Sequence, residues 1–189
     1  MNRKFGVLFL AASLTAFAAC SGGGSTTNPN QAEINTATAD FAETATLIFE
    51  DFNGVVDCQD FQDVINSYTG TPVACDSGTV TVTVVSSSCD DGPPLFAEAT
   101  FSVVADNCQD NDFNTLSDGS LQMDLDYEGS NSGDVNVSST GIDVNGLNFD
   151  FDNFLVTVSA SANTVTCTGN MSVDGDSCTL ASDCDSCAF

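Results

Sequence analysis

The sequence predicts an α+β protein, with N-terminal amphipathic helices packed on a curved antiparallel β-meander or partial barrel that disulfides hold together. Three observations lead to this prediction. Apolar residues recur with a helical period over residues 32–68, they alternate with polar residues over 78–175, and the chain of 189 residues contains nine cysteines. These patterns are typical of helices followed by half-buried strands in a single, exported domain.

The first twenty residues resemble the signal of a bacterial lipoprotein. Arg3 and Lys4 precede an apolar stretch, Phe5 to Leu14, and small residues then lead to Phe17-Ala18-Ala19-Cys20. The apolar stretch is too short to remain as a membrane span. The last four residues are similar to a lipobox, whose cysteine is acylated and becomes the first residue after cleavage. The resemblance implies a signal peptide over 1–19, an acylated Cys20 and a flexible tether over 20–31.

Cysteine parity supports the same interpretation of Cys20. If Cys20 carries lipid, eight cysteines are left, and an even number can pair completely in an oxidising compartment. The alternative is an ordinary cleaved signal with one free cysteine. Because Ser21 stands where an Asp would indicate inner-membrane retention, the resemblance implies a Gram-negative outer membrane as the destination. The eight cysteines are Cys58, Cys75, Cys89, Cys108, Cys167, Cys178, Cys184 and Cys187.

The helical part of the domain is expected at residues 32–68. Between Ala32 and Phe52 the apolar residues stand three, four or seven positions apart, which predicts one amphipathic helix. A second, shorter helix is predicted around Phe61 to Tyr68, before the turn residues Thr69-Gly70-Thr71-Pro72.

Seven or so strands are expected at residues 78–175. The segment "SLQMDLDYE" (120–128) is the clearest, because its apolar residues alternate strictly with Gln, Asp and Glu. Such alternation indicates a sheet with one buried face and one wet, acidic face. The order of a predicted helix, then Cys75 and then "GTVTV" resembles uncharacterised β-rich lipoproteins of the Gram-negative envelope. Similar alternation occurs in "GTVTVTVV", "AEATFSVVAD", "DVNVS", "LNFDFD", "FLVTVS" and "TVTCTGNMSV".

One disulfide is predicted from hairpin geometry. If the first two strands form a hairpin centred near residues 91 and 92, paired residue numbers add up to about 183, which places Cys75 opposite Cys108. The partners of the other six cysteines stay open. Residues 176–189 are expected to be a Cys-rich tail, and its "CDSC" segment is interpreted as structural rather than as a redox pair or half a zinc site.

Charge excludes several functions. The only two basic residues are Arg3 and Lys4, so the 27 acidic residues that follow Cys20 give a formal side-chain charge of −27. Without cations, the chain cannot neutralise phosphates, and nucleic acid is excluded as a partner. Self-repulsion also has no internal salt bridge to relieve it, so stability should rise with ionic strength or calcium.

The composition also argues against most kinds of enzyme active site. Ser or Cys catalysis needs a base, and the chain after Cys20 has neither His nor Lys. A carboxylate pair, as in glycosidases, remains a weak third hypothesis. Calcium ligands are conceivable at Asp106, Asp110 and Asp112 or at Asp174 to Asp185, although an EF-hand pattern is absent and a solvated acidic loop is the alternative.

We therefore expect a non-catalytic lipoprotein of the outer membrane, facing either the periplasm or the surface. It would be a structural, adhesive or binding module, with calcium as the one cation it could use for stability and with no other cofactor. It would contact the membrane through its N-terminal lipid, and its protein or small-molecule partner stays open. The alternative function is a carrier whose apolar cavity would be lined by Leu121, Met123, Leu125, Phe149 and Phe151.

Overall fold

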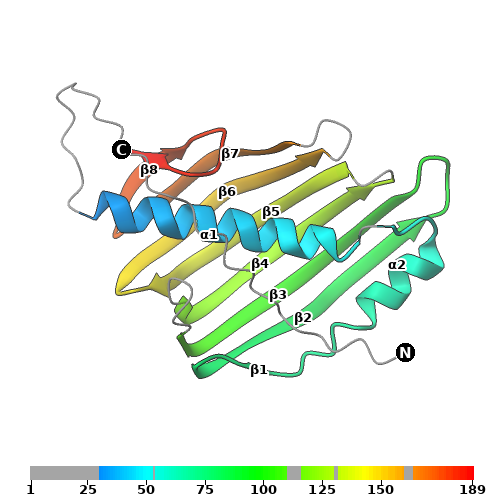
Figure 1. Cartoon of the computed structure of the whole chain (residues 1–189), viewed down its shortest axis with the longest axis horizontal. Helices are drawn as coiled ribbons and strands as arrows, with labels where there is room; N and C mark the ends of the chain where they lie inside the picture. Colours follow the sequence, from blue (N-terminus) through cyan, green and yellow to red (C-terminus); the bar gives the residue numbers. More distant parts are fainter. Residues whose placement is uncertain (1–29, 53, 110–115, 130–131, 160–163) are drawn as a thin grey trace.

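A single antiparallel sheet dominates the protein (Figure 1). The computed structural model describes residues 30–52, 54–109, 116–129, 132–159 and 164–189. The nine strands lie side by side in chain order. They are β1 (Val73–Ala74), β2 (Ser77–Asp90), β3 (Phe96–Gln109), β4 (Leu116–Glu128), β5 (Ser132–Val144), β6 (Leu147–Ser159), β7 (Thr164–Val173), β8 (Asp176–Leu180) and β9 (Cys187–Ala188).

Among the described residues, two helices precede the sheet, α1 (Gln31–Glu50) and α2 (Cys58–Ile65). Figure 1 shows α1 crossing one face of the sheet obliquely and α2 beside the end of β2. Asp57 caps α2, because its carboxylate accepts a hydrogen bond of 2.9 Å from the Asp60 backbone N–H. This cap satisfies a free N–H group of the first turn.

The predicted α+β class is wrong. Strands make up 60% of the structure and helices 17%, so the protein is mainly β, and a layer of N-terminal helices on the sheet does not define its fold. The predicted antiparallel sheet is confirmed, with its strands in chain order, whereas the alternative of a partial barrel is wrong because β1 and β9 lie at opposite edges of the sheet. The share of strand is higher than expected because β2 to β6 have 13 or 14 residues each. In addition, the predicted Cys-rich tail contributes strands β8 and β9.

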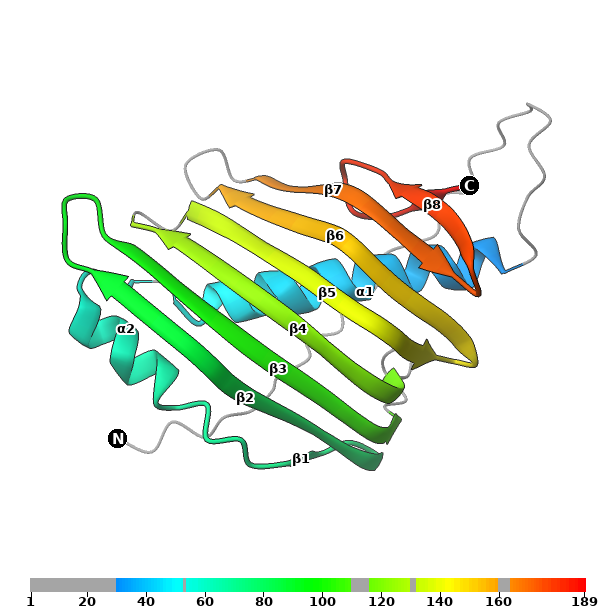
Figure 2. The same cartoon turned by 180° about the vertical axis from the view of Figure 1, so that it is seen from behind.

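The core lies on one face of the sheet, where alternate side chains are buried. In β4 these are Leu121, Met123, Leu125 and Tyr127, each no more than 3% exposed. Aromatic rings fill much of the same region: Phe41 of α1 lies 4.6 Å from Phe151, measured between ring centroids. Edge-to-face contacts of this kind add to the free energy gained by burying apolar area. The opposite face of the sheet has no helix in front of it among the described residues (Figure 2).

Turns and bulges follow from residues that tolerate positive φ. Asn145 and Gly146 join β5 to β6 with φ angles of 55° and 83°, and Asp174 and Gly175 join β7 to β8 in the same way. Two-residue turns of this type match the twist of antiparallel strands. Gly169 has φ of 124°, and a Cβ atom there would lie 1.7 Å from the Asn153 carbonyl oxygen. Only glycine therefore fits opposite the β6 bulge.

Candidate functional site

The most distinctive surface is the polar face of the sheet, on the side opposite the core. Residues of neighbouring strands stand directly opposite one another here, and Glu98 of β3 pairs with Asp126 of β4, which pairs with Asp134 of β5. We call these three residues the acidic row. Like charges at directly opposed positions of an antiparallel sheet are destabilising. The row forms because three adjacent strands, β3, β4 and β5, each have an acidic residue at the same paired position.

A hollow of about 480 Å³ lies around the acidic row. A second hollow of about 490 Å³ lies towards the β2–β3 turn and shares Ser88, Glu98 and Asp126 with the first. The two hollows thus form one continuous acidic surface. The first is lined by Ser86, Ser87, Ser88, Glu98, Ala99, Thr100, Asp124, Leu125, Asp126, Asp134, Asn136 and Leu155.

Some acceptors in the first hollow have donors and others lack them. Thr100 Oγ1 donates to Asp124 at 2.8 Å, and Ser88 Oγ donates to Glu98 at 3.3 Å. In contrast, Asp134 Oδ1 and Asn136 Oδ1 are inaccessible to solvent and have no hydrogen-bond donor. A buried acceptor without a donor costs free energy, because it loses its water and gains nothing in return. Both atoms are enclosed by protein, so they are not available to a group that binds in the hollow.

The charge of the row affects its central member. Desolvation, followed by the charges of Glu98 and Asp134, raises the pKa of Asp126 above its ordinary value. Both causes act in the same direction because each disfavours the ionised carboxylate. A positive charge placed over the row would remove part of this penalty.

The eight cysteines after the signal form four disulfides, and these include the predicted pair Cys75–Cys108. The hairpin register behind that prediction is two residues off, since Val80 pairs with Ala105 rather than Val103. The pair still forms because the chain turns sharply before β2, where Cys75 N–H donates to Gly78 O at 3.2 Å. The other disulfides are Cys58–Cys89, Cys167–Cys184 and Cys178–Cys187.

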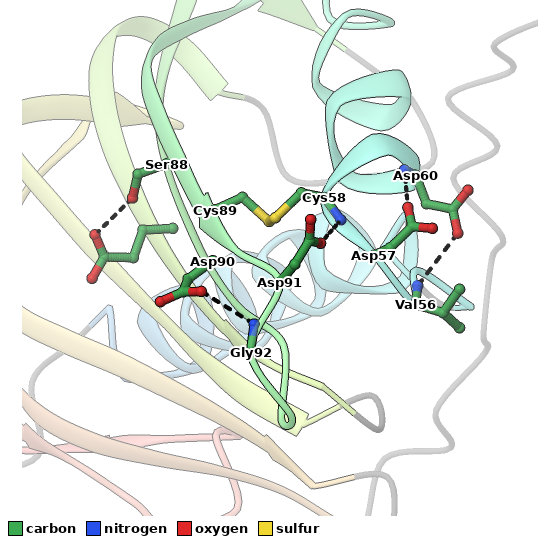
Figure 3. Close-up of a disulfide and its surroundings, with 10 residues drawn as sticks. Val56, Asp57, Cys58, Asp60, Ser88, Cys89, Asp90, Asp91 and Gly92 are labelled. Atoms are coloured by element: carbon green, nitrogen blue, oxygen red, sulfur yellow. Dashed lines mark hydrogen bonds between the residues drawn. A yellow bond between two sulfur atoms is a disulfide. The ribbon is translucent and has the colours of Figure 1, made fainter.

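The disulfide Cys58–Cys89 joins the start of α2 to β2 and lies among aspartate side chains (Figure 3). The Cys58 backbone N–H donates to Asp91 at 2.6 Å. Ligand atoms of Cys58, Cys89 and Asp91 lie within 4.8 Å of one another, which is a spacing that a metal ion could use. Since both sulfur atoms belong to the disulfide, neither can serve as the thiolate that metals bind. These residues staple α2 to the sheet.

The predicted calcium ligands are only partly placed. Asp106 is an exposed residue near the end of β3, where its carboxylate accepts a hydrogen bond from Asn107 at 3.2 Å. Asp110 and Asp112 lie outside the described residues. In the second acidic segment, Asp174 accepts a hydrogen bond of 3.0 Å from Asn148 N–H and so supports the β7–β8 turn. Asp174 therefore has a structural role in this turn.

The residues expected to line an apolar cavity are buried against protein. Leu121, Met123 and Leu125 are at most 3% exposed, and Phe149 and Phe151 contact the ring of Phe41. The "CDSC" cysteines are not joined to each other, because Cys184 pairs with Cys167 and Cys187 with Cys178. This segment has no dithiol for redox chemistry in the oxidised protein.

The sequence did not reveal the acidic row, nor the two buried acceptors without donors, Asp134 Oδ1 within the row and Asn136 Oδ1 next to it. The signal was present in the outward positions of "AEATFSVVAD", "SLQMDLDYE" and "DVNVS", but bringing them to one level requires the register of two hairpins. Neither described helix is long and apolar enough to span a membrane. Comparison with protein families, curated proteins and solved structures yields no match to this chain.

Proposed function

We propose that the chain is a lipid-anchored protein of the outer membrane that acts as a non-catalytic binding or structural module of the cell envelope. The observation that carries this proposal is the pairing of the cysteines. The eight cysteines after Cys20 are joined in four pairs. No partner is left for Cys20 within the chain, which suits an acylated residue, and four disulfides suit an oxidising compartment.

The composition supports a binding role over catalysis. After Cys20 the chain has no Lys, Arg or His, the usual bases and phosphate clamps. Its polar face offers an acidic surface, so binding of cations or of cationic partners is the interaction that the charges favour. Calcium could stabilise such a surface by reducing repulsion. The apolar carrier lacks comparable support, because its expected lining contacts other protein side chains.

The anchor can be tested by expressing the full chain in a Gram-negative host with an alkyne-tagged palmitate. The wild-type protein should incorporate the label and fractionate with the outer membrane. C20A should incorporate none and should keep its signal peptide, because cleavage at a lipobox follows acylation. Label in C20A, or wild-type protein released in soluble form, would contradict the proposal.

A matched variant separates anchoring from sorting. S21D keeps Cys20 and should be labelled as well as the wild-type protein, but it should move to the inner-membrane fraction. S21A serves as the control for a change at the same position without a charge, and it should stay in the outer membrane. Wild-type sorting of S21D, or movement of S21A to the inner membrane, would contradict the role proposed for residue 21 in sorting.

A further inference from the structure

We propose that Asn145 is a site of spontaneous deamidation, and that the carboxylate of Asp143 sets the rate of this modification in the folded protein. Asp143 lies in β5, and Asn145 lies in the exposed two-residue turn, Asn145-Gly146, that leads into β6. This inference goes beyond the binding or structural role proposed above and does not depend on it.

The fold itself requires a reactive pair of residues in this turn. Val144 pairs with Leu147, so two residues connect β5 to β6, and their φ angles are 55° and 83°. Asparagine followed by glycine is the preferred pair where both central residues of a hairpin turn have positive φ. The same pair is the one most prone to deamidation, because glycine has no side chain to hinder attack on the asparagine.

The reaction uses atoms of the turn and solvent water. The Gly146 nitrogen loses its proton and attacks Cγ of Asn145, so that an N–Cγ bond forms, the Cγ–Nδ2 bond breaks, and ammonia leaves with that proton. Water then opens the five-membered succinimide ring. Attack at Cγ leaves aspartate at position 145 in the normal backbone, whereas attack at the backbone carbonyl carbon moves the chain onto Cβ and Cγ as isoaspartate.

Asp143 opposes the first step of this reaction. The Gly146 backbone N–H donates a hydrogen bond of 3.0 Å to Asp143 Oδ1. The bond holds the proton that must leave, and the negative carboxylate disfavours the anionic nitrogen that must form. The nitrogen can therefore attack only in the fraction of molecules in which this bond has opened.

Similar contacts occur at two aspartate–glycine pairs of the sheet, at positions 91–92 and 174–175. Gly92 N–H donates a hydrogen bond of 3.1 Å to Asp90 Oδ1, and Asp174 Oδ1 accepts one of 3.0 Å from Asn148 N–H. In each turn a hydrogen bond occupies either the glycine nitrogen or the carboxylate that would react. Because an ionised carboxylate is a poorer electrophile than an amide, Asn145 is the most reactive of the three positions.

The test follows deamidation in the full-length protein, processed by an exporting host and kept in non-ionic detergent at mildly alkaline pH. The peptide with Asn145 is released by chymotrypsin and analysed by mass spectrometry, since trypsin finds no basic residue after Cys20. D143A should deamidate at least about fivefold faster than the wild-type protein, because a hydrogen bond to a charged group corresponds to a factor of roughly ten or more. The reduced, urea-unfolded wild-type chain gives the rate without the turn and should deamidate faster than the folded protein.

D174G is the matched control for loosening and for charge. It removes one negative charge and the acceptor of Asn148 N–H, while glycine keeps the positive φ of 53° at that position. Asn148 pairs with Asp143, so the change lies at the same end of the sheet, but the bond from Gly146 to Asp143 stays in place. The rate at Asn145 in D174G should stay within about twofold of the wild-type rate.

Each outcome decides the proposal. Faster deamidation of Asn145 in D143A, without acceleration in D174G, supports it. An equal rate in D143A and the wild-type protein would overturn it. Equal acceleration in D143A and D174G would also overturn it, because charge or general loosening would then set the rate. A folded wild-type protein that deamidates as fast as its unfolded chain would show that the turn gives no protection. Thermal unfolding confirms that both variants are folded at the incubation temperature.

Discussion

The disulfide Cys75–Cys108 provides a quantitative test of what holds the sheet together. Its removal in C75S/C108S opens a loop of 33 residues. In the chain-entropy account a loop of that length is worth about 3.7 kcal/mol of stability. The disulfide Cys58–Cys89 interlaces with it, however, and gives a second path between Cys75 and Cys89, while the segment from Cys89 to Cys108 is common to both paths. The effective loop is then about 27 residues, which lowers the expected loss only to about 3.5 kcal/mol.

The assay is urea unfolding followed by circular dichroism, extrapolated linearly to water. C58S/C89S is the matched comparison, because its loop spans 31 residues and should cost nearly the same. A loss of about 3.5 kcal/mol is a large share of a typical stability of about 5–15 kcal/mol. If either variant loses less than about 1 kcal/mol, or if the two differ more than twofold, chain entropy is not the dominant reason.

Three further predictions concern the core and the charges. Y127F removes the buried hydrogen bond of 3.2 Å from Tyr127 to the Val55 carbonyl and should cost about 1 kcal/mol in urea unfolding; no change would mean that this carbonyl finds another donor. D126N should melt at a higher temperature than the wild-type protein at neutral pH. The raised pKa of Asp126 means that the folded state binds more protons, so wild-type stability falls as pH rises through the interval between the ordinary and the raised pKa. The advantage of D126N should vanish below that interval, and an advantage that persists there would refute the electrostatic reason. Finally, the melting temperature should rise between about 10 mM and 300 mM NaCl, because salt screens the repulsion among the acids; a flat series would contradict it.

The sequence predicts the position and direction of the strands better than the class of the fold. Alternation in "SLQMDLDYE" correctly indicates which side of β4 is buried, because one-sided burial imposes a period of two. Alternation does not say where a sheet ends. The two helices predicted within residues 32–68 correspond closely to α1 and α2, so the class is wrong because the strands outweigh them, and the Cys-rich tail hides strands β8 and β9.

The candidate site was harder to predict because it depends on register. Asp126 and Asp134 are eight residues apart in the chain, and they face each other only because the turn between β4 and β5 sets that pairing. A shift of one residue would turn the acids of one strand towards the core. The predicted pair Cys75–Cys108 shows the same limit, since the cysteines join although the register of β2 and β3 differs from the one expected.

The positions of the disulfides explain how a sheet without salt-bridge partners can keep an acidic face. Two disulfides fasten the β2 side, where α2 and the β1–β2 link meet the sheet, and two fasten β7, β8 and the chain around β9. Strands at an edge have only one neighbour and can pair with other chains. Covalent links at both edges therefore protect the places where the sheet would open first. The central strands β3 to β5 have neighbours on both sides, and they can carry the destabilising acidic row because their stability comes from the ladders and from the core beneath them.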